Sequence, residues 1–261
     1  MLYYFCGMNT RIFCLIIGFS VFVASGCAVK KQLGQTNNDK NTYPIQYQIF
    51  IPEGDKQIKR PLILFLHGSG ERGHDNLKQT VHVYTFLTSD SIQKRYPAIV
   101  VAPQCPEEDY WAPVKRFEWS MTRGGKVTPA MAAVINLLEE LRKQPNVDST
   151  RMYVIGLSMG GFGTLDLISR RPEWFSAAVP ICGGADLTNT DKIKEVPLWV
   201  FHGAEDTVVP VKLSRDLVNE LTIKGIPARY TEYAGENHGI WERAIREPGF
   251  LEWMFSQNMK K

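Results

Sequence analysis

One serine in this 261-residue chain has the surroundings of a nucleophile. Ser158 lies in Gly156-Leu157-Ser158-Met159-Gly160, between a β-favouring run and a helix-like segment. A serine at a tight strand-to-helix turn stands clear of the sheet, and the two glycines avoid collisions with neighbouring elements. The following helix would direct its N-terminal N–H groups toward the serine oxygen. The alternative is an ordinary glycine-rich turn in which the serine only caps the helix.

A serine hydroxyl needs a base to remove its proton, and the chain has five histidines. His238 follows the last predicted strand in a glycine-flanked turn and is the expected base. His67 and His202 each precede a glycine at a strand end, where a structural role is more common. His74 and His82 belong to a loop and a helix and have no partner pattern.

The base in turn needs a carboxylate that holds its ring in the right tautomer. Asp206 follows a strand and precedes an amphipathic helix, which makes it the expected acid. Its neighbour Glu205 should point elsewhere, and Asp186, after the preceding strand, is the rival. Serine, acid and base then follow one another in the order expected for successive strand ends.

The elements that must position these residues alternate between strands and helices. The connections are too short for a second domain, so we predict one α/β domain over residues 44–258. Its mostly parallel sheet should have about seven strands, with helices on both faces. The expected strands lie near residues 45–51, 61–66, 98–102, 152–155, 177–182, 197–201 and 229–233, and the expected helices near 77–87, 128–143, 164–171, 211–224 and beyond 239.

Composition and cysteine positions exclude several classes of function. A net charge of +3 without a basic stripe argues against nucleic-acid binding. Paired-cysteine and histidine-rich metal spacings are absent from the sequence, and we expect no metal and no cofactor. Cys105 and Cys182 both end strands, and the expected strand order puts two other strands between them. That separation is too large for a disulfide, so both should be free and buried.

The N-terminus reads as a targeting segment. Residues 1–26 contain a short apolar run that ends in small residues before Cys27, as in the lipobox of bacterial lipoproteins. We therefore expect a signal peptide over 1–26, lipidation at Cys27 and a flexible tether over 27–43. This places the protein in the bacterial cell envelope on a lipid anchor; secretion or an uncleaved anchor is the alternative. Met1 or Met8 could be the start, and the membrane and leaflet stay open.

With these motifs in view, the chain resembles the α/β-hydrolase family from about Gln46 to Phe255. The resemblance rests on the strand pattern and four short motifs. It is closest to the phospholipase/carboxylesterase-like and dienelactone-hydrolase-like branch, which includes some predicted peptidases. It implies an oxyanion hole made by the backbone N–H groups of Ser69 and Met159. The four motifs are Leu66-His67-Gly68-Ser69-Gly70, Gly156-Leu157-Ser158-Met159-Gly160-Gly161, His202-Gly203-Ala204-Glu205-Asp206 and Asn237-His238-Gly239.

An irregular, aromatic-rich segment over residues 107–127 is the expected wall of the substrate pocket. Trp111 and Trp119 are its candidate pocket residues, with plain packing under a long loop as the alternative. Arg72 and Arg123 could bind an anionic or sugar substrate, although exposed arginines usually do not. The long apolar insertion of true lipases is missing, which favours small or soluble esters.

Together these features predict a serine carboxylic-ester hydrolase that works through an acyl-enzyme. Its expected substrate is a small molecule or an acylated glycan. The main alternative is a serine peptidase of the prolyl-oligopeptidase type acting on short peptides. A binding lipoprotein that keeps the fold without activity is a further alternative, disfavoured because all three triad positions are filled. The sequence indicates neither the substrate nor an oligomeric state.

Overall fold

A computed structural model describes four stretches of the chain, residues 28–32, 45–54, 58–115 and 120–259. The predicted signal peptide, the lipidation site Cys27, tether residues 33–43 and the pocket candidate Trp119 lie outside them. Within the described residues, no helix is both long enough and apolar enough to cross a membrane.

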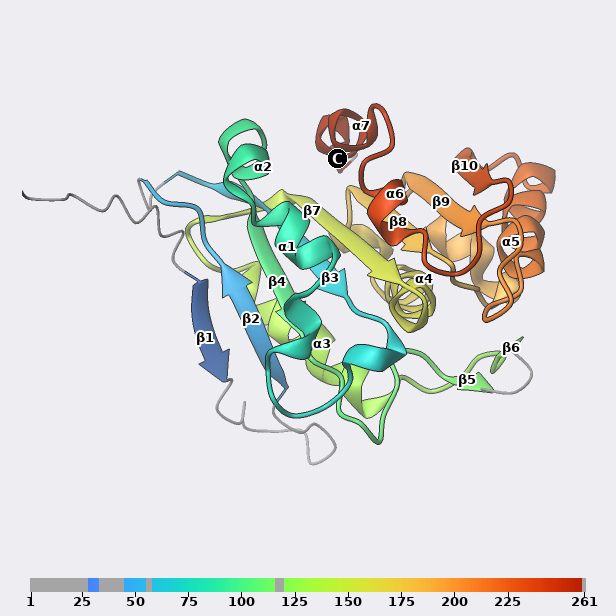
Figure 1. Ribbon diagram of the computed structural model, residues 1–261, viewed down its shortest axis with the longest axis horizontal. Helices are drawn as coiled ribbons and strands as arrows, with labels where there is room; N and C mark the ends of the chain where they lie inside the picture. Colours follow the sequence, from blue (N-terminus) through green and yellow to red (C-terminus); the bar gives the residue numbers. More distant parts are fainter. Residues whose placement is uncertain (1–27, 33–44, 55–57, 116–119, 260–261) are drawn as a thin grey trace, which may run out of the picture.

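An eight-stranded sheet runs through the molecule in the order β1-β2-β4-β3-β7-β8-β9-β10 (Figure 1). All pairs from β4 to β10 are parallel, whereas β2 is antiparallel to both β1 and β4. This confirms the predicted single α/β domain with a mostly parallel sheet. The strands are β1 Ala28–Gln32, β2 Gln46–Phe50, β3 Arg60–Leu66, β4 Ile99–Pro103, β7 Val147–Leu157, β8 Ala177–Ile181, β9 Leu198–Gly203 and β10 Ala228–Tyr233.

The additional strand is β1, which lies in the segment that the sequence predicts as a flexible tether. Residues 28–32 pair with β2 in register, Ala28 opposite Phe50 and Gln32 opposite Gln46. For these five residues the tether prediction is wrong. Without β1, one edge of β2 would expose unpaired backbone N–H and C=O groups, and pairing satisfies them.

Helices cover both faces of the sheet, as predicted (Figure 1). One buried cluster joins α3, α4 and α5 to one face, and a second joins α1, α6 and α7 to the other. A small hairpin of β5 Val114–Lys115 and β6 Ser120–Met121 lies apart from the sheet. The helices are α1 Val83–Leu87, α2 Asp90–Arg95, α3 Pro129–Leu141, α4 Met159–Arg170, α5 Lys212–Ile223, α6 Trp241–Ala244 and α7 Phe250–Ser256.

The helix predicted over residues 77–87 forms two separate pieces. A 3₁₀ turn over Lys78–Thr80 and helix α1 are divided at His82, whose φ is +54°. A non-glycine residue in that conformation cannot continue a right-handed helix. The apolar pattern alone does not reveal this break.

Successive side chains of β3 alternate between the two buried clusters, one on each face of the sheet. Leu62, Leu64 and Leu66 belong to the cluster under α3, α4 and α5, whereas Ile63 and Phe65 belong to the opposite cluster. Successive side chains of a strand point to opposite faces, so a strand covered on both faces must be apolar throughout.

Cys105 and Cys182 are free and buried, as predicted. They follow β4 and β8, and the sheet order places β3 and β7 between those two strands. The prediction of two unbridged cysteines is therefore confirmed.

Two glycines allow α4 to start directly on top of the sheet. A Cβ at Gly156 would lie 2.0 Å from the carbonyl oxygen of Gly160, and one at Gly160 would lie 1.9 Å from that of Leu66. Both contacts are with backbone, which cannot move aside as a flexible side chain can. The glycines flanking Ser158 are thus required by close packing, in agreement with the sequence interpretation.

Candidate active site

Ser158 occupies a strained turn between β7 and α4. Its φ of +53° and ψ of −117° lie outside the regions that a non-glycine residue normally occupies. Its backbone N–H donates to the carbonyl oxygen of Ile181 on β8, at 2.8 Å. This bond and the glycine contacts hold a conformation that would otherwise cost about 1–3 kcal/mol.

The structure brings Ser158, His238 and Asp206 together in one hydrogen-bonded row. His238 Nε2 lies 2.9 Å from Ser158 Oγ, and His238 Nδ1 lies 2.7 Å from Asp206 Oδ2. Because a carboxylate can only accept, Nδ1 carries the proton and Nε2 presents its lone pair to the serine hydroxyl. Such a row can move a proton from the hydroxyl to the imidazole.

Asp206 is held from several sides and its side chain is fully buried. Its Oδ1 accepts from the backbone N–H groups of Val208 and Val209, each at 2.8 Å. Burial would raise the pKa of this carboxyl, but hydrogen bonds from His202, His238 and the Val209 N–H outweigh burial and hold the pKa well below its usual range. Asp206 therefore remains a charged acceptor for His238.

The rival acid, Asp186, does not face this row. Its carboxylate accepts from the backbone N–H of Gly124 at 3.0 Å and from the N–H and hydroxyl of Thr188. It caps the 3₁₀ segment Leu187–Ile193. These local bonds account for Asp186 as a structural carboxylate.

His202 forms a second, buried contact with Asp206. Its Nε2 lies 3.2 Å from Asp206 Oδ2 and 3.0 Å from the carbonyl oxygen of Val209. Both of these atoms are acceptors, so Nε2 must carry a proton. The other ring nitrogen, Nδ1, lies 2.7 Å from the Ser214 hydroxyl. His202 thus links α5 to the acid of the row, a role that its place before a glycine does not reveal.

Cys182 also lies beside this acid, and ligand atoms of Cys182, His202 and Asp206 lie within 4.8 Å of one another. Burial and the Asp206 charge raise the pKa of the Cys182 thiol. The thiol donates to the carbonyl oxygen of His238, at 3.5 Å. This hydrogen bond accounts for the position of Cys182 beside the row.

Two backbone N–H groups near Ser158 fit the expected oxyanion hole. Met159 is the first residue of α4, where backbone N–H groups have no partner inside the helix. Ser69 follows Gly68, which packs tightly against the turn: a Cβ at Gly68 would lie 2.8 Å from Leu157 Cδ1 and 3.7 Å from Ser158 Cβ. Both residues line the cavity at Ser158, and their backbone N–H groups remain the expected donors to a carbonyl oxygen.

His67 fixes the loop that carries Ser69. Its Nδ1 lies 2.6 Å from the carbonyl oxygen of Gly68, and its Nε2 accepts from the backbone N–H of Cys105 at 2.9 Å. This pattern requires a neutral ring with the proton on Nδ1. Burial lowers the pKa of His67 to about 4, from an ordinary value of 6.5.

Trp111 is a core residue and not a pocket wall, so that part of the pocket prediction is wrong. Its side chain is fully buried, and its indole N–H donates to the carbonyl oxygen of His67 at 3.0 Å. The rings of the two residues also make an edge contact. An aromatic residue in an irregular segment can face either the core or the solvent, and the sequence does not distinguish the two.

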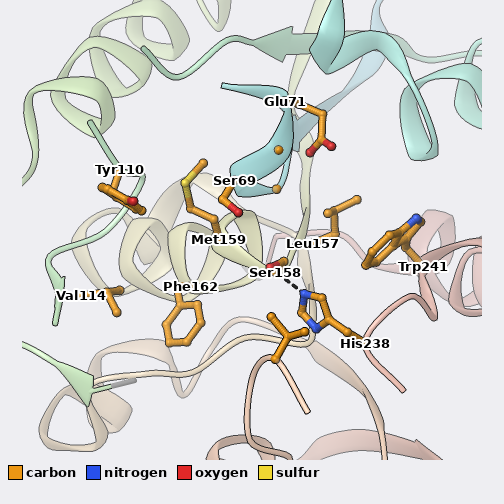
Figure 2. A pocket seen from close by; sticks show the side chains of 13 residues that line it. Ser69, Glu71, Tyr110, Val114, Leu157, Ser158, Met159, Phe162, His238 and Trp241 are labelled. Atoms are coloured by element: carbon orange, nitrogen blue, oxygen red, sulfur yellow. Dashed lines mark hydrogen bonds between the residues drawn. The ribbon is translucent and has the colours of Figure 1, made fainter. Parts of the chain in front are cut away.

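A cavity of about 610 Å³ opens above Ser158. The 107–127 segment contributes two of its residues, Tyr110 and Val114. Figure 2 shows that these two lie with Phe162 on one side of Ser158, whereas Glu71, Leu157 and Trp241 lie on the other. The described lining residues are Gly68, Ser69, Gly70, Glu71, Tyr110, Val114, Leu157, Ser158, Met159, Phe162, Val208, His238 and Trp241.

Sequence reasoning missed Glu71, Phe162 and Trp241 as lining residues. Phe162 is one helical turn beyond Ser158, and Trp241 lies three residues after His238. The Trp241 ring packs edge-on against the His238 ring, with centroids 5.7 Å apart. The available signal for Phe162 and Trp241 was their short distance along the chain from Ser158 and His238, and for Glu71 its place two residues after Ser69.

The two candidate arginines lie elsewhere. Arg72 donates to the carbonyl oxygens of Ser69, at 3.0 Å, and Glu107, at 2.6 Å, and its guanidinium lies over the Tyr110 ring. Arg72 therefore stabilises the loop that carries Ser69. Arg123 lines a second cavity of about 380 Å³, beyond Phe162.

Residues 48–248, most of the chain, match the profile of a family described as phospholipase/carboxylesterase. Among curated proteins, poly(3-hydroxyalkanoate) depolymerase C of Paucimonas lemoignei is 26% identical over 65% of this chain and 39% of its own length. The bifunctional acetylxylan esterase/xylanase XynS20E of Neocallimastix patriciarum is 27% identical over 57% of this chain and 20% of its own length. The chain thus spans well under half of these two relatives.

Among solved structures, a thermostable esterase is 36% identical. It superimposes with a TM-score of 0.79, over 88% of this chain and 63% of that chain. The names of the XynS20E protein and of this solved structure both print an esterase, and that of the third protein prints a poly(3-hydroxyalkanoate) depolymerase.

The lowered pKa of His67 predicts that the free energy of unfolding depends on pH. The folded state keeps the ring neutral down to a pKa of about 4, whereas the unfolded chain takes up a proton near 6.5. The free energy of unfolding should fall by about 3 kcal/mol through this group as the pH falls from 6.5 to 4. Urea unfolding of wild type and His67→Gln across this range should give curves that converge at low pH. Parallel curves would contradict the assignment, and His74→Gln, at an exposed histidine, is the control.

The contact between His202 and Asp206 predicts that replacing His202 lowers activity, although His202 does not contact Ser158. His202→Gln should lower kcat/KM by about tenfold, with the loss in kcat, because Asp206 loses one of the side chains that hold it. Ser214→Ala, which removes only the outer partner of His202, should have a smaller effect. Steady-state kinetics of both variants on one ester tests this order. Equal activities of wild type and His202→Gln would be incompatible with a positioning role.

Proposed function

The chain belongs to the phospholipase/carboxylesterase family and is a serine hydrolase, and from this premise we propose that it cleaves carboxylic esters with Ser158, His238 and Asp206. The observation that carries the proposal is the unbroken hydrogen-bonded row from hydroxyl to buried carboxylate, open to a cavity at its serine end. An uninterrupted row of this kind is the arrangement that activates a serine.

In the proposed reaction, Ser158 Oγ attacks the ester carbonyl carbon while its proton passes to His238 Nε2. Asp206 stabilises the imidazolium that forms. The tetrahedral intermediate collapses as His238 gives its proton to the departing alcohol, leaving an acyl-serine. Water then attacks the acyl carbon, again with His238 as base, and the carboxylic acid leaves.

The oxyanion of each tetrahedral intermediate would be met by the backbone N–H groups of Ser69 and Met159. Both belong to parts of the chain that are held before substrate arrives, Ser69 through the His67 ring and Met159 through the start of α4. Preorganised donors stabilise developing charge without reorganising, and each typically contributes about 10²–10³ in rate.

The cavity supports substrates of modest size. A volume of about 610 Å³ accommodates a short acyl chain and a small alcohol or sugar. The names of the relatives include an acetylxylan esterase and a poly(3-hydroxyalkanoate) depolymerase. We therefore propose small soluble esters or acyl groups on glycans as substrates.

We also propose attachment to the bacterial envelope through a lipid on Cys27. The support is the sequence alone: an apolar run closed by small residues before the cysteine. In this arrangement the lipidated Cys27 would directly precede β1, so the edge of the sheet would lie close to the membrane. Substrates at the envelope would then be the ones within reach.

An activity screen of the purified protein tests the function. It compares p-nitrophenyl acetate, butyrate and a long-chain ester with acetylated and feruloylated xylan fragments and a proline-containing peptide amide. Short-ester turnover should fall about 10⁴-fold or more in Ser158→Ala, and about 10⁴-fold in Asp206→Asn.

Asp186→Asn is the matched control, because it makes the same change at the carboxylate that caps a turn. Its turnover should stay within about threefold of wild type. Peptide cleavage with little ester turnover would replace the esterase with a peptidase. Ester turnover that survives Ser158→Ala would refute the assigned nucleophile.

A further inference from the structure

Glu71 is the feature of the cavity that the proposed reaction does not use. No lysine or arginine belongs to the described residues that line the cavity, and Glu71 is the acidic residue among them. Most of the other lining side chains are apolar or aromatic. One negative charge in a mostly apolar site is a strong constraint on the ligand, because the ligand must complement that charge.

The Glu71 carboxylate points into the cavity from the loop that carries Ser69. Its Oε2 would lie 3.0 Å from a Cβ at Gly68, the same point that lies 3.7 Å from Ser158 Cβ. Figure 2 shows it on the side of Ser158 where Leu157 and Trp241 also lie. The carboxylate is therefore close to the reacting centre and lines the same cavity as the Trp241 ring.

The backbone of this turn is held, while the carboxylate itself has no partner among the described residues. Gln104 Nε2 donates to the carbonyl oxygen of Glu71 at 3.0 Å. The adjacent cation, Arg72, turns away to the carbonyl oxygens of Ser69 and Glu107. Glu71 is thus presented to the cavity without the neutralising contact that its neighbour could have supplied.

An uncompensated carboxylate beside the oxyanion N–H groups has a cost. It repels the negative charge that develops on the substrate carbonyl oxygen. A positively charged group on the substrate would remove this repulsion, and an aromatic ring such as that of Trp241 adds a favourable surface for an ammonium ion.

We propose that Glu71 makes this site selective for esters that carry an ammonium group on one side of the scissile bond and an apolar group on the other. The ammonium group binds between Glu71 and Trp241, and the apolar group lies against Tyr110, Val114 and Phe162. This inference rests on the proposed ester hydrolysis and specifies its substrate class.

Two pairs of esters that differ in charge but not in shape test the selectivity. In the first pair, acetylcholine carries the charge on its alcohol, and 3,3-dimethylbutyl acetate is its uncharged counterpart. In the second pair, a 4-(trimethylammonio)butanoate ester carries the charge on its acyl group, and the 5,5-dimethylhexanoate ester of the same alcohol is its uncharged counterpart. Wild type should favour the cationic member of one pair by about tenfold in kcat/KM.

Glu71→Gln should abolish that preference, because the amide keeps the shape of the side chain and removes the charge that attracts the ammonium group. Glu108→Gln is the matched control, since it removes the same charge from an exposed glutamate on the neighbouring loop. It should keep the preference. Equal turnover of both members of each pair in wild type, or a preference that persists in Glu71→Gln, would overturn the proposal.

A binding measurement that needs no turnover separates this proposal from the proposed function. Ligand-observed NMR would compare tetramethylammonium with uncharged tert-butyl alcohol on wild type and on Glu71→Gln. Wild type should bind the cation preferentially and Glu71→Gln should not. Cation binding that depends on Glu71 in a protein that hydrolyses no ester would refute the ester hydrolysis and leave the cation site standing. Equal binding of both probes would overturn the cation site even if esters are cleaved.

Discussion

The close contact between the start of α4 and the sheet is the constraint on which the site depends. The carbonyl oxygens of Leu66 and Gly160 occupy the space that side chains at Gly160 and Gly156 would need. Because the backbones approach so closely, the turn at Ser158 must adopt a positive φ, which lifts the hydroxyl out of the sheet. The same contact sets the N-terminal N–H of α4 beside the hydroxyl. The nucleophile and one proposed oxyanion donor therefore come from one packing arrangement.

A second requirement is that the buried Asp206 carboxylate has a hydrogen-bond partner for each of its oxygens. Asp206 has two backbone N–H donors on one oxygen and two histidines near the other. A buried carboxylate without such partners would take up a proton and could no longer orient His238. His202 belongs to this arrangement although it never reaches the cavity. The loop after β9 and the start of α5 are therefore part of the catalytic support.

The hydrogen-bonded row of the site was predictable from the residue types at strand ends. Ser158, Asp206 and His238 follow β7, β9 and β10 of a parallel sheet, whose carboxyl ends meet at one edge, so their meeting follows from topology. The cavity wall was less predictable, because it depends on where side chains point. Trp111 enters the core beneath His67, and Glu71 turns outward from the same region. Pairing of residues 28–32 with β2 is a tertiary effect that their polar sequence does not indicate.

The central claim is that Ser158 is made nucleophilic by His238 in the folded protein. Treatment with a fluorophosphonate, followed by intact-mass analysis and peptide mapping, tests it without reference to any natural substrate. The account predicts one adduct per chain, located on Ser158, formed slowly or not at all in His238→Ala and absent after unfolding. An adduct on another residue, or labelling of Ser158 at the same rate in His238→Ala, would contradict the account.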